Sequence, residues 1–381
     1  MKNIPYGRQQ IDRDDIDAVV KTLQSDFLTQ GPRIEEFENA FAEYIGVKYA
    51  VAVSNATAGL HIANMALEVK TGDRVITTPI TFAATANASR YCGAEVWFAD
   101  INPYTYLLDI NAVTKLIESK PKGFFSGIIP VDFGGLPIDL EAFRNLANKH
   151  NLWIIEDAAH APGGYFIDSK GMKNNCGNGR YADCAVFSFH PVKHIACGEG
   201  GMVTTNDKKL YELLKLYRSH GITKENMNEN HGGWFYEMQA LGYNYRLTDM
   251  QAALGLSQLA KNPQGVIARN RLADKYKNAF KTAGIKFQSL PKDSYNAHHL
   301  FVIEIENRKG LYDHLRAQNI FAQIHYIPLH TLPYYKAIGY GDADLSNAEN
   351  YYKHCISLPM YPSLTDTEQD FVIQKVLEFH E

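Results

Sequence analysis

Short apolar segments alternate with helical segments over the first 205 residues, and this alternation restricts the possible folds more than any other feature. The apolar segments are YAVAVS (49–54), RVITTP (74–79), AEVWFAD (94–100), FSGIIPV (125–131) and LWIIED (152–157). Helical stretches such as INAVTKLIES and LEAFRNLANKH separate them. Strands and helices that alternate in this way are typical of parallel βαβ units. We therefore predict an α/β fold with a mostly parallel sheet between two layers of helices.

The alternation becomes less regular after Thr205. Thr248 and Gln251 have the spacing of a capping box, which predicts the start of a helix. NPQG at 262–265 predicts an interruption of that helix, and a second helix is expected to end near Gly284. The change of pattern indicates that a second structural unit begins in this region.

The last part of the chain mixes strand-like and helical patterns, as in an α+β domain. HHLFVIEI (298–305) and FAQIHYI (321–327) are predicted strands, and a second capping box at Thr365 opens a final helix. A chain of 381 residues is long enough for two or three domains. We predict a large domain over 1–250 and a smaller C-terminal domain over 251–381. The N-terminal segment is a candidate to pack on the smaller domain.

Composition excludes several classes of protein. The net charge is −4 without any basic block, which argues against nucleic acid and anionic membranes as partners. The N-terminus lacks the apolar segment of a signal peptide, and no apolar run approaches eighteen residues. Five cysteines without a CxxC pair predict reduced thiols and a cytoplasmic protein. The 14 histidines lack HExxH or other ligand spacing, so no metal is expected.

One lysine lies in an unusual setting, within SFHPVKHIACGEGGMV (188–203). Lys193 follows the strand-like segment CAVFSFH, near Ser188, and precedes a cluster of glycines. A lysine in a partly desolvated, glycine-lined site loses proton affinity and becomes a nucleophile and base. The alternative interpretation is a solvated lysine in a surface loop.

Asp157 ends the apolar segment LWIIED, and His160 lies three residues further on. Ligands of parallel sheets bind at the carboxyl ends of strands, so Asp157 is a candidate partner for a pyridinium nitrogen. The alternative is that Asp157 caps a helix that starts there.

Two further segments contain candidate residues. In VAVSNATAGLHIANMAL, small residues between a strand and a helix leave Ala56 and Thr57 free to hold a phosphate, or they form an ordinary helix cap. In GYNYRLTDMQAALG, Asn244 precedes a helix. GNGRYA (177–182) resembles a dinucleotide fingerprint, but it precedes a strand instead of a helix, so we interpret it as a loop.

These segments together resemble the sugar aminotransferases of the DegT/DnrJ/EryC1/StrS family, from about Tyr6 to the end of the chain. The motifs that carry the resemblance are SNATAGLHIA, TPITFAATANA, EDAAHA, SFHPVKHIACGEGGMV, RSHG and GYNYRLTDMQAALGLSQL. The resemblance implies a pyridoxal-phosphate enzyme with the type I fold of aspartate aminotransferase. It also implies a homodimer with shared active sites.

The resemblance assigns roles residue by residue. It implies that Lys193 forms the Schiff base with the cofactor, that Asp157 pairs with the pyridine nitrogen and that His160 contacts the ring hydroxyl. The other implied cofactor residues bind the phosphate or the ring face: Ala56, Thr57 and Ser188 at the phosphate, Phe82 on the ring, and Asn244 reaching the phosphate from the partner subunit. Ala56 stands where relatives often have glycine, and His160 where many have glutamine.

Within the family, the sequence is most similar to enzymes that aminate C4 of a UDP-linked 4-keto-6-deoxy-N-acetylhexosamine on the way to pseudaminic acid, with L-glutamate as the expected donor. The residues implied to line the nucleotide-sugar site are Tyr6, Phe27, Leu28, Thr29, His325 and Tyr326. Two alternatives remain: another nucleotide-linked keto-sugar, and a non-catalytic sugar-binding or regulatory protein of the same fold. A tyrosine-rich segment that includes His330, Tyr334 and Tyr335 is either part of this site or a domain edge.

Overall fold

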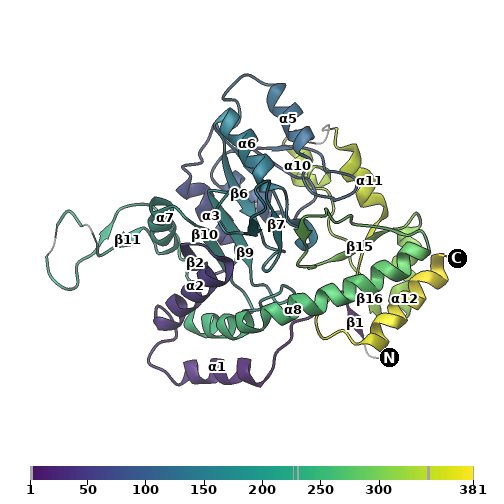
Figure 1. Ribbon diagram of the computed structural model, residues 1–381. Helices are drawn as coiled ribbons and strands as arrows, with labels where there is room; N and C mark the ends of the chain where they lie inside the picture. The colour runs from purple at the N-terminus through teal and green to yellow at the C-terminus, as the bar shows by residue number, and fades with distance from the viewer. Residues whose placement is uncertain (1–2, 226, 230, 341–343, 381) are drawn as a thin grey trace.

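The centre of the molecule is a seven-stranded sheet (Figure 1) in a computed structural model that describes residues 3–225, 227–229, 231–340 and 344–380. Its strands, in chain order, are β2 (Tyr49–Val53), β3 (Arg74–Thr77), β4 (Glu95–Phe98), β5 (Gly127–Ile129), β6 (Trp153–Asp157), β9 (Cys184–Ser188) and β10 (Gly201–Thr205). Their spatial order is β2-β10-β9-β6-β5-β3-β4. β10 runs antiparallel to both of its neighbours, and the other pairs are parallel. The predicted α/β class is confirmed.

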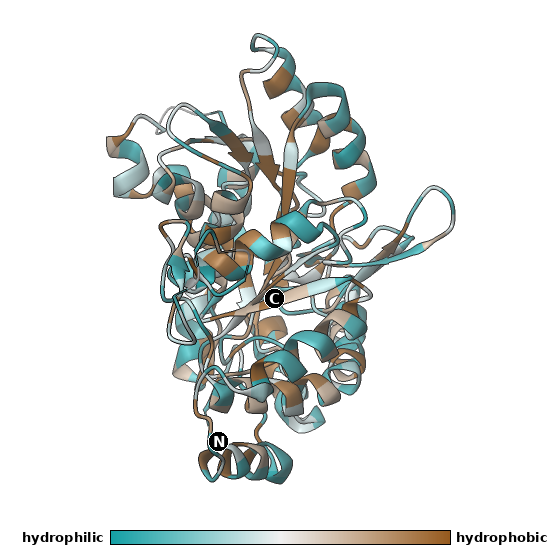
Figure 2. Ribbon diagram, turned by 90° about the vertical axis from the view of Figure 1, so that its left-hand side faces the viewer, coloured by the Kyte–Doolittle hydropathy of each residue, from teal (hydrophilic) through white to brown (hydrophobic). Residues whose placement is uncertain are grey.

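Helices cover both faces of this sheet because neighbouring strand residues point to opposite sides. On one face Ala50 and Ala52 pack with Phe37 and Phe41 of α2 (Pro32–Ile45). On the other face Val51 and similar residues pack against α3 (Ala56–Ala66) and α7 (Lys208–Arg218). Three more helices complete the layers: α4 (Ala84–Tyr91), α5 (Ile110–Glu118) and α6 (Leu140–His150). In Figure 2 the central strands are brown and the outer sides of the helices teal, as expected for one buried sheet.

The capping box at Thr248 is confirmed, but the predicted interruption at 262–265 is wrong: α8 runs without a break from Asp249 to Thr282, with Pro263 inside it. A proline in a helix interior costs about 3 kcal/mol, so packing must offset the loss. The neighbouring Asn262 is buried, and its Nδ2 donates to Tyr44 Oη at 2.8 Å and to Pro162 O at 3.1 Å. Tertiary contacts therefore decide the conformation of this segment.

α8 belongs to two cores. Its first half packs against α1 (Arg13–Leu23) and α2, and Ala252 and Leu259 join the core beneath α2. Its second half, through Tyr276 and Phe280, joins a separate core in the C-terminal part. The domain boundary near residue 250 stays a prediction, and α8 is the element that connects the two cores (Figure 1).

The C-terminal core surrounds an antiparallel sheet of β13 (Lys286–Phe287), β15 (Phe301–Glu304) and β17 (Cys355–Leu358). α9 (Arg308–Ala317) and α12 (Asp366–His380) pack there, and the capping box that precedes α12 is present as predicted. The predicted strand at 321–327 is wrong for most of its length, since β16 comprises only Ile320–Phe321. β16 pairs with β1 (Ile4–Pro5), so the N-terminal segment lies on this part of the molecule. The remaining short helices are α10 (Pro333–Ala337) and α11 (Ser346–His354).

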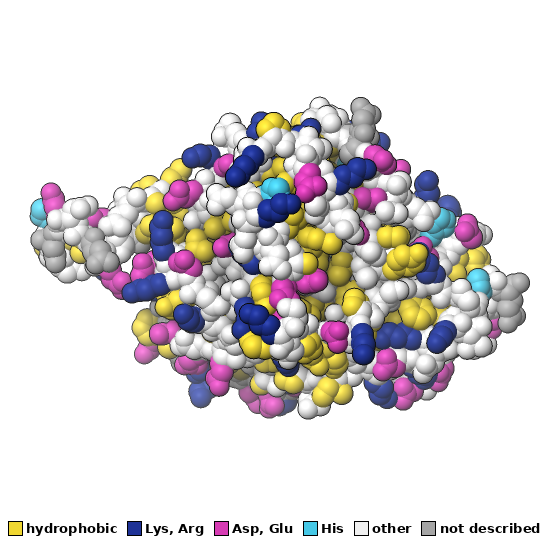
Figure 3. Space-filling model, turned by 45° about the horizontal axis from the view of Figure 1, so that its top comes forward, with side chains coloured by type: hydrophobic (Ala, Val, Ile, Leu, Met, Phe, Trp, Pro, Cys, Tyr) yellow, Lys and Arg dark blue, Asp and Glu magenta, His cyan; other side chains and the backbone are white. Residues whose placement is uncertain are grey.

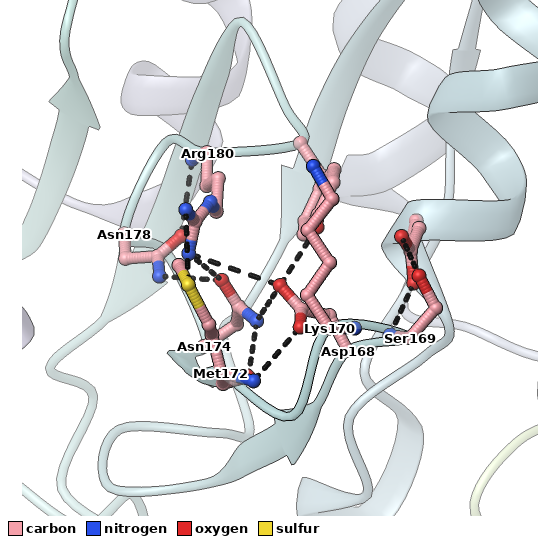
Figure 4. A network of polar contacts seen from close by, with 9 residues as sticks. Asp168, Ser169, Lys170, Met172, Asn174, Asn178 and Arg180 are labelled. Carbon is pink, nitrogen blue, oxygen red and sulfur yellow. Dashed lines mark hydrogen bonds and ion pairs between the residues drawn. The ribbon is translucent and has the colours of Figure 1, made fainter.

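A turn between β7 (Tyr165–Ile167) and β8 (Lys173–Asn175) is organised by the carboxylate of Asp168 (Figure 4). This carboxylate accepts hydrogen bonds from the Met172 N–H at 2.8 Å and from Asn174 Nδ2 at 3.1 Å, among others. The hydrogen bond from the Met172 backbone is the main cause that lowers the pKa of Asp168 to about 2. The Asp168 carboxylate therefore stays ionised at every pH near neutrality. Its hydrogen bonds hold the turn in the segment that connects β6 to β9.

A hairpin formed by β11 (Ile222–Thr223) and β12 (Glu237–Met238) projects from the body of the molecule (Figure 1). It carries Trp234, which is 75% exposed, and leads to Leu241, which is 73% exposed. On the face drawn in Figure 3, side chains of both charges are interspersed. Among the described residues, no helix is both long enough and apolar enough to cross a membrane.

Candidate active site

Lys193 lies in the loop after β9, where its N–H donates to His190 O and closes a turn. Its Nζ is 3.4 Å from His299 Nε2. Burial of the amine lowers the pKa of Lys193 to about 7, while the negative charge of Asp157 acts in the opposite direction. A large fraction of this amine is therefore neutral near pH 7, unlike a solvated lysine in a surface loop.

Asp157 is the last residue of β6 and is buried. Both carboxylate oxygens accept hydrogen bonds: Oδ2 from Thr85 Oγ1 at 2.7 Å, and Oδ1 from the Ala159 N–H at 3.2 Å. Burial raises the pKa of Asp157, and the hydrogen bond from Thr85 is the main opposing influence. No helix follows, because residues 158–164 form turns, so the alternative of a helix cap is wrong. The carboxylate is held instead at the carboxyl edge of the sheet.

Thr85, on α4, was not identified as a site residue from the sequence. It lies in TFAATANA, a stretch of small residues that gives no local sign of a carboxylate 72 residues away. Thr81 Oγ1 lies 2.8 Å from Thr85 Oγ1 and continues the chain of hydroxyl groups. A hydroxyl that accepts from one neighbour and donates to another is fixed in direction, so this pair orients the Thr85 proton toward Asp157.

His160 is neutral, because burial lowers its pKa well below the ordinary value and the charge of Lys193 adds to that effect. The Gly134 N–H donates to His160 Nδ1 at 3.2 Å, so the ring proton is on Nε2. Nε2 lies 3.3 Å from Tyr326 Oη and donates to it. His160 thus presents its proton toward Tyr326, a residue of the predicted sugar site.

The predicted phosphate residues meet where β9, β10 and α3 come together. Asn55 caps α3 by accepting from the Ala58 N–H at 2.8 Å, which leaves the first-turn N–H groups of Ala56 and Thr57 at the helix start. Gly201 pairs in register with Ser188. A Cβ atom on Gly201 would lie 2.7 Å from the Ala56 nitrogen, so only glycine permits β10 to pass here. Ser188 is therefore brought beside the N-terminus of α3.

Three of the predicted sugar-site residues lie together. The ring centroids of Tyr6 and His325 are 5.1 Å apart, and those of Tyr326 and Phe82 are 6.3 Å apart. Burial lowers the pKa of His325 to about 3, so this imidazole is neutral, and its Nδ1 lies 2.8 Å from Ser357 Oγ. The arrangement joins the sugar-site residues to His160 through Tyr326.

The other predicted site residues, Phe27–Thr29 and Asn244, lie in the region between α7 and α8. Leu28 O accepts from the Asp249 N–H, and Thr29 forms a bridge with Thr248, so Phe27–Thr29 lies at the start of α8. Asn244 forms a bridge with Ser219. These contacts join the group to the α7–α8 region, not to Lys193 or Asp157.

The tyrosine-rich segment beyond the site is structural in part. Tyr335 is 1% exposed, and its Oη donates to Asn87 Oδ1 at 2.7 Å. His330 is equally buried, with Nε2 3.1 Å from Glu349 Oε1. This burial agrees with the interpretation of His330 and Tyr335 as part of a domain edge. Tyr334 differs from them, because it is 53% exposed.

Two buried acids lie behind Asp157. Glu156 points to the opposite face of β6 and accepts from the Gly177 N–H, and Asp132 Oδ1 accepts from the Ile138 N–H at 2.9 Å. Asp132 Oδ2 has no hydrogen-bond partner among the described residues. Burial raises the pKa of Asp132 to about 6 and that of Glu156 in the same direction. Their ligand atoms and Cys176 Sγ lie within 4.8 Å of one another. Burial therefore favours the protonated forms of both acids, and the expected lack of a metal stays a prediction.

Comparison with known proteins gives matches over nearly the whole chain. Residues 9–377 match the DegT/DnrJ/EryC1/StrS aminotransferase family. The spore coat polysaccharide biosynthesis protein SpsC of Bacillus subtilis is 37% identical over 384 residues, which cover 98% of this chain and 96% of that protein. A UDP-4-amino-4,6-dideoxy-N-acetyl-beta-L-altrosamine transaminase of Campylobacter jejuni is 38% identical over 378 residues, with 97% and 95% covered. The structure of Helicobacter pylori PseC, an aminotransferase involved in the biosynthesis of pseudoaminic acid, matches with a TM-score of 0.89 at 33% identity and 99% coverage of both chains.

Proposed function

The chain belongs to the DegT/DnrJ/EryC1/StrS family of pyridoxal-phosphate-dependent sugar aminotransferases, and from this premise we propose its substrate and the roles of its residues. It is an aminotransferase that acts on nucleotide sugars with a glutamate-type amino donor. We propose that it transfers the amino group of L-glutamate to the C4 ketone of UDP-2-acetamido-2,6-dideoxy-β-L-arabino-hexos-4-ulose. The observation that carries the catalytic part is a partly neutral Lys193 together with a buried, hydrogen-bonded Asp157 whose charge acts on it.

The residues present fit pyridoxal phosphate. Asp157 is a buried carboxylate with two hydrogen-bond donors, which is suited to a protonated ring nitrogen, and Lys193 is the amine that the aldehyde requires. Ala56, Thr57 and Ser188 would hold the phosphate at the start of α3, and Phe82 and His160 would contact the ring. When bound, the cofactor supplies an electron sink for the carbanion that forms beside the amino nitrogen.

Lys193 carries out the proton transfers in this proposal. Its neutral Nζ takes the proton from the carbon on one side of the amino nitrogen, becomes an ammonium group, and gives that proton to the carbon on the other side within the same half-reaction. The second half-reaction, with the sugar, runs the same two transfers in reverse. Asp157 stays ionised, and it would stabilise the positive charge of the ring nitrogen when the cofactor is bound. Thr85 and the Ala159 N–H keep the carboxylate in place, because each satisfies one of its oxygens.

Support for the sugar substrate comes from the relatives and from the aromatic group around Tyr326. The Campylobacter protein is named as a transaminase of an altrosamine derivative, and the Helicobacter protein as an aminotransferase involved in the biosynthesis of pseudoaminic acid. Tyr6, His325 and Tyr326 lie together beside His160, where a sugar would meet the cofactor. The Bacillus relative is named for spore coat polysaccharide instead, which favours a second candidate: another nucleotide-linked keto-sugar.

We further propose a homodimer with shared sites. Phe27 and Leu28 are 52% and 46% exposed, and they lie with Asn244 outside the Lys193 region of their own chain. The projecting hairpin adds Trp234 and Leu241 as exposed apolar side chains. A two-fold partner would cover these residues and would place Asn244 at the partner's phosphate site.

A product assay tests the substrate. The purified enzyme is mixed with L-glutamate and, separately, with UDP-linked, dTDP-linked and GDP-linked 4-keto-sugars, and each product is identified by NMR. We expect amination at C4 of the UDP-linked L-arabino ketone, and no use of pyruvate in place of the sugar. Preference for a dTDP-linked sugar would refute the substrate proposal and leave the family assignment unchanged.

His325→Ala should slow the sugar half-reaction and spare the glutamate half-reaction. This variant therefore reports whether the group of Tyr6, His325 and Tyr326 binds the sugar.

A further inference from the structure

His299 is a close neighbour of the Lys193 amine that the proposed function does not use. It lies two residues before β15, 106 positions beyond Lys193, with its Nε2 3.4 Å from Nζ. The ring is buried, and Nδ1 has no hydrogen-bond partner among the described residues. The backbone fixes the position: the Ala297 N–H donates to Gly135 O, and Ala297 O accepts from His194 Nε2 at 2.8 Å.

The surroundings of His299 keep it neutral. Its ring packs against those of His160 and His194, with centroids 4.4 and 5.9 Å apart. Burial lowers the pKa of His299 well below its ordinary value, and the charges of Lys193 and Arg269 add to the effect. A second positive charge beside Lys193 is therefore excluded. The Lys193–His299 pair carries at most one positive charge, and that charge is on Lys193.

The contact has a defined direction when Lys193 is protonated. An ammonium group can only donate, so His299 Nε2 must then accept, and the proton of the neutral ring is on Nδ1. The distance of 3.4 Å is at the long end for a hydrogen bond, and contacts of this kind shorten when substrate binds. His299 Nε2 therefore offers the ammonium form of Lys193 one acceptor in a fixed position.

We propose that His299 accepts a hydrogen bond from Lys193 Nζ during the reaction and thereby positions the ammonium group for return of its proton. This inference rests on the proposed role of Lys193. In the transfer, Nζ forms a bond to the proton, the bond from that proton to carbon breaks, and the electron pair stays with the substrate and cofactor. One of the three N–H bonds then points to His299 Nε2, which leaves the other two to serve the substrate.

The competing explanation is that His299 only fills space beneath His160. An apolar side chain would fill the same space without burying two polar ring nitrogens. The 3.4 Å contact of His299 Nε2 with Lys193 Nζ is the reason that we favour a polar role. His298 is a matched control, because it is equally buried but its Nε2 lies 3.5 Å from Lys277 Nζ, not from Lys193.

The test compares His299→Leu, His299→Gln and His298→Gln in the full chain. Competitive labelling with acetic anhydride, followed by mass spectrometry, gives the pKa of the Lys193 amine after removal of the cofactor. Single-turnover absorbance gives the rate of the glutamate half-reaction in the loaded enzyme. We expect His299→Leu to lower the pKa of Lys193 by about one unit and to slow the half-reaction about 10-fold, since the charged form loses an acceptor. His299→Gln, which keeps an acceptor oxygen, should restore much of both, and His298→Gln should change neither.

An unchanged pKa of Lys193 in His299→Leu would overturn the inference, as would equal losses in the leucine and glutamine variants. If His299→Leu is insoluble, His299→Asn replaces it, because the shorter amide stops short of Nζ. Turnover that persists in Lys193→Ala would instead refute the proposed function, and the labelling experiment tells these two failures apart.

Discussion

Thr85 donates a 2.7 Å hydrogen bond to Asp157 from a helix that is 72 positions earlier in the chain. The contact joins α4, the helix that follows β3, to the end of β6, and in the sheet β5 lies between β3 and β6. It satisfies one oxygen of a buried carboxylate and opposes the rise in the pKa of Asp157 that burial causes. The charge that the proposed mechanism requires at Asp157 therefore depends on a hydroxyl from another element.

Thr85→Val should reduce turnover about 10-fold or more, because a hydrogen bond to a charged group contributes about 1.5–3 kcal/mol. The valine keeps the shape of the side chain, so the melting temperature should change little. Steady-state kinetics and thermal unfolding measure the two quantities. Thr81→Val, which removes only the second hydroxyl, is the control and should have a smaller effect. Equal turnover in Thr85→Val and the unmodified enzyme would contradict this reasoning.

Lys193→Ala should abolish turnover, with a loss of at least about 1,000-fold, because nucleophile and proton carrier disappear together. Borohydride reduction of the loaded enzyme, followed by peptide mapping, should find the cofactor on the Lys193 peptide. A label on Lys170 or Lys173 instead would refute the assignment.

Asp157→Asn should retain much of the cofactor affinity and lose about 100-fold or more in rate. The phosphate residues at α3 remain, whereas the ionic partner of the ring nitrogen is gone. Cofactor absorbance after dialysis measures retention, and single-turnover kinetics measures the rate. Near-normal turnover would leave Asp157 with a structural role only.

Asp132→Asn should flatten the pH dependence of stability. In the folded protein the pKa of Asp132 is raised to about 6, so the proton is kept there while the unfolded chain releases it near pH 4. The stabilisation is therefore present below about pH 4 and is lost as the pH rises to about 6. Denaturant unfolding at pH 4, 6 and 8 measures this loss, which should be smaller in Asp132→Asn. The exposed Asp26→Asn is the control, and an unaltered slope in Asp132→Asn would show that protonation of Asp132 does not contribute to the pH dependence.

Mixed dimers should recover activity if the sites are shared. A Lys193→Ala chain and an Asn244→Ala chain are each expected to be impaired as homodimers. Together they should form about one working site per mixed dimer, since each two-fold assembly then contains one site with both intact residues. Tagged subunits separated by tandem affinity purification provide the mixed species. Verified mixed dimers without recovery would place Asn244 in its own subunit's site or outside both sites.

The sequence by itself determined the α/β class, the positions of six of the seven central strands, the capping boxes at Thr248 and Thr365 and the setting of Lys193 at a strand end. The antiparallel strand β10 was not predicted. These features are local, because alternation, capping and turn residues act over a few positions. The family resemblance, carried by motifs in a fixed order, supplied the cofactor and is confirmed by the family match.

Only the tertiary structure decided which distant groups meet. The contacts Thr85–Asp157 and Lys193–His299 join residues 72 and 106 positions apart, and their existence depends on the spatial order of the strands. The same holds for α8, where packing on both sides of Pro263 overrides a local signal for interruption. Local propensities amount to a few tenths of a kcal/mol up to about 3 kcal/mol per residue, which burial of side chains from several elements can exceed.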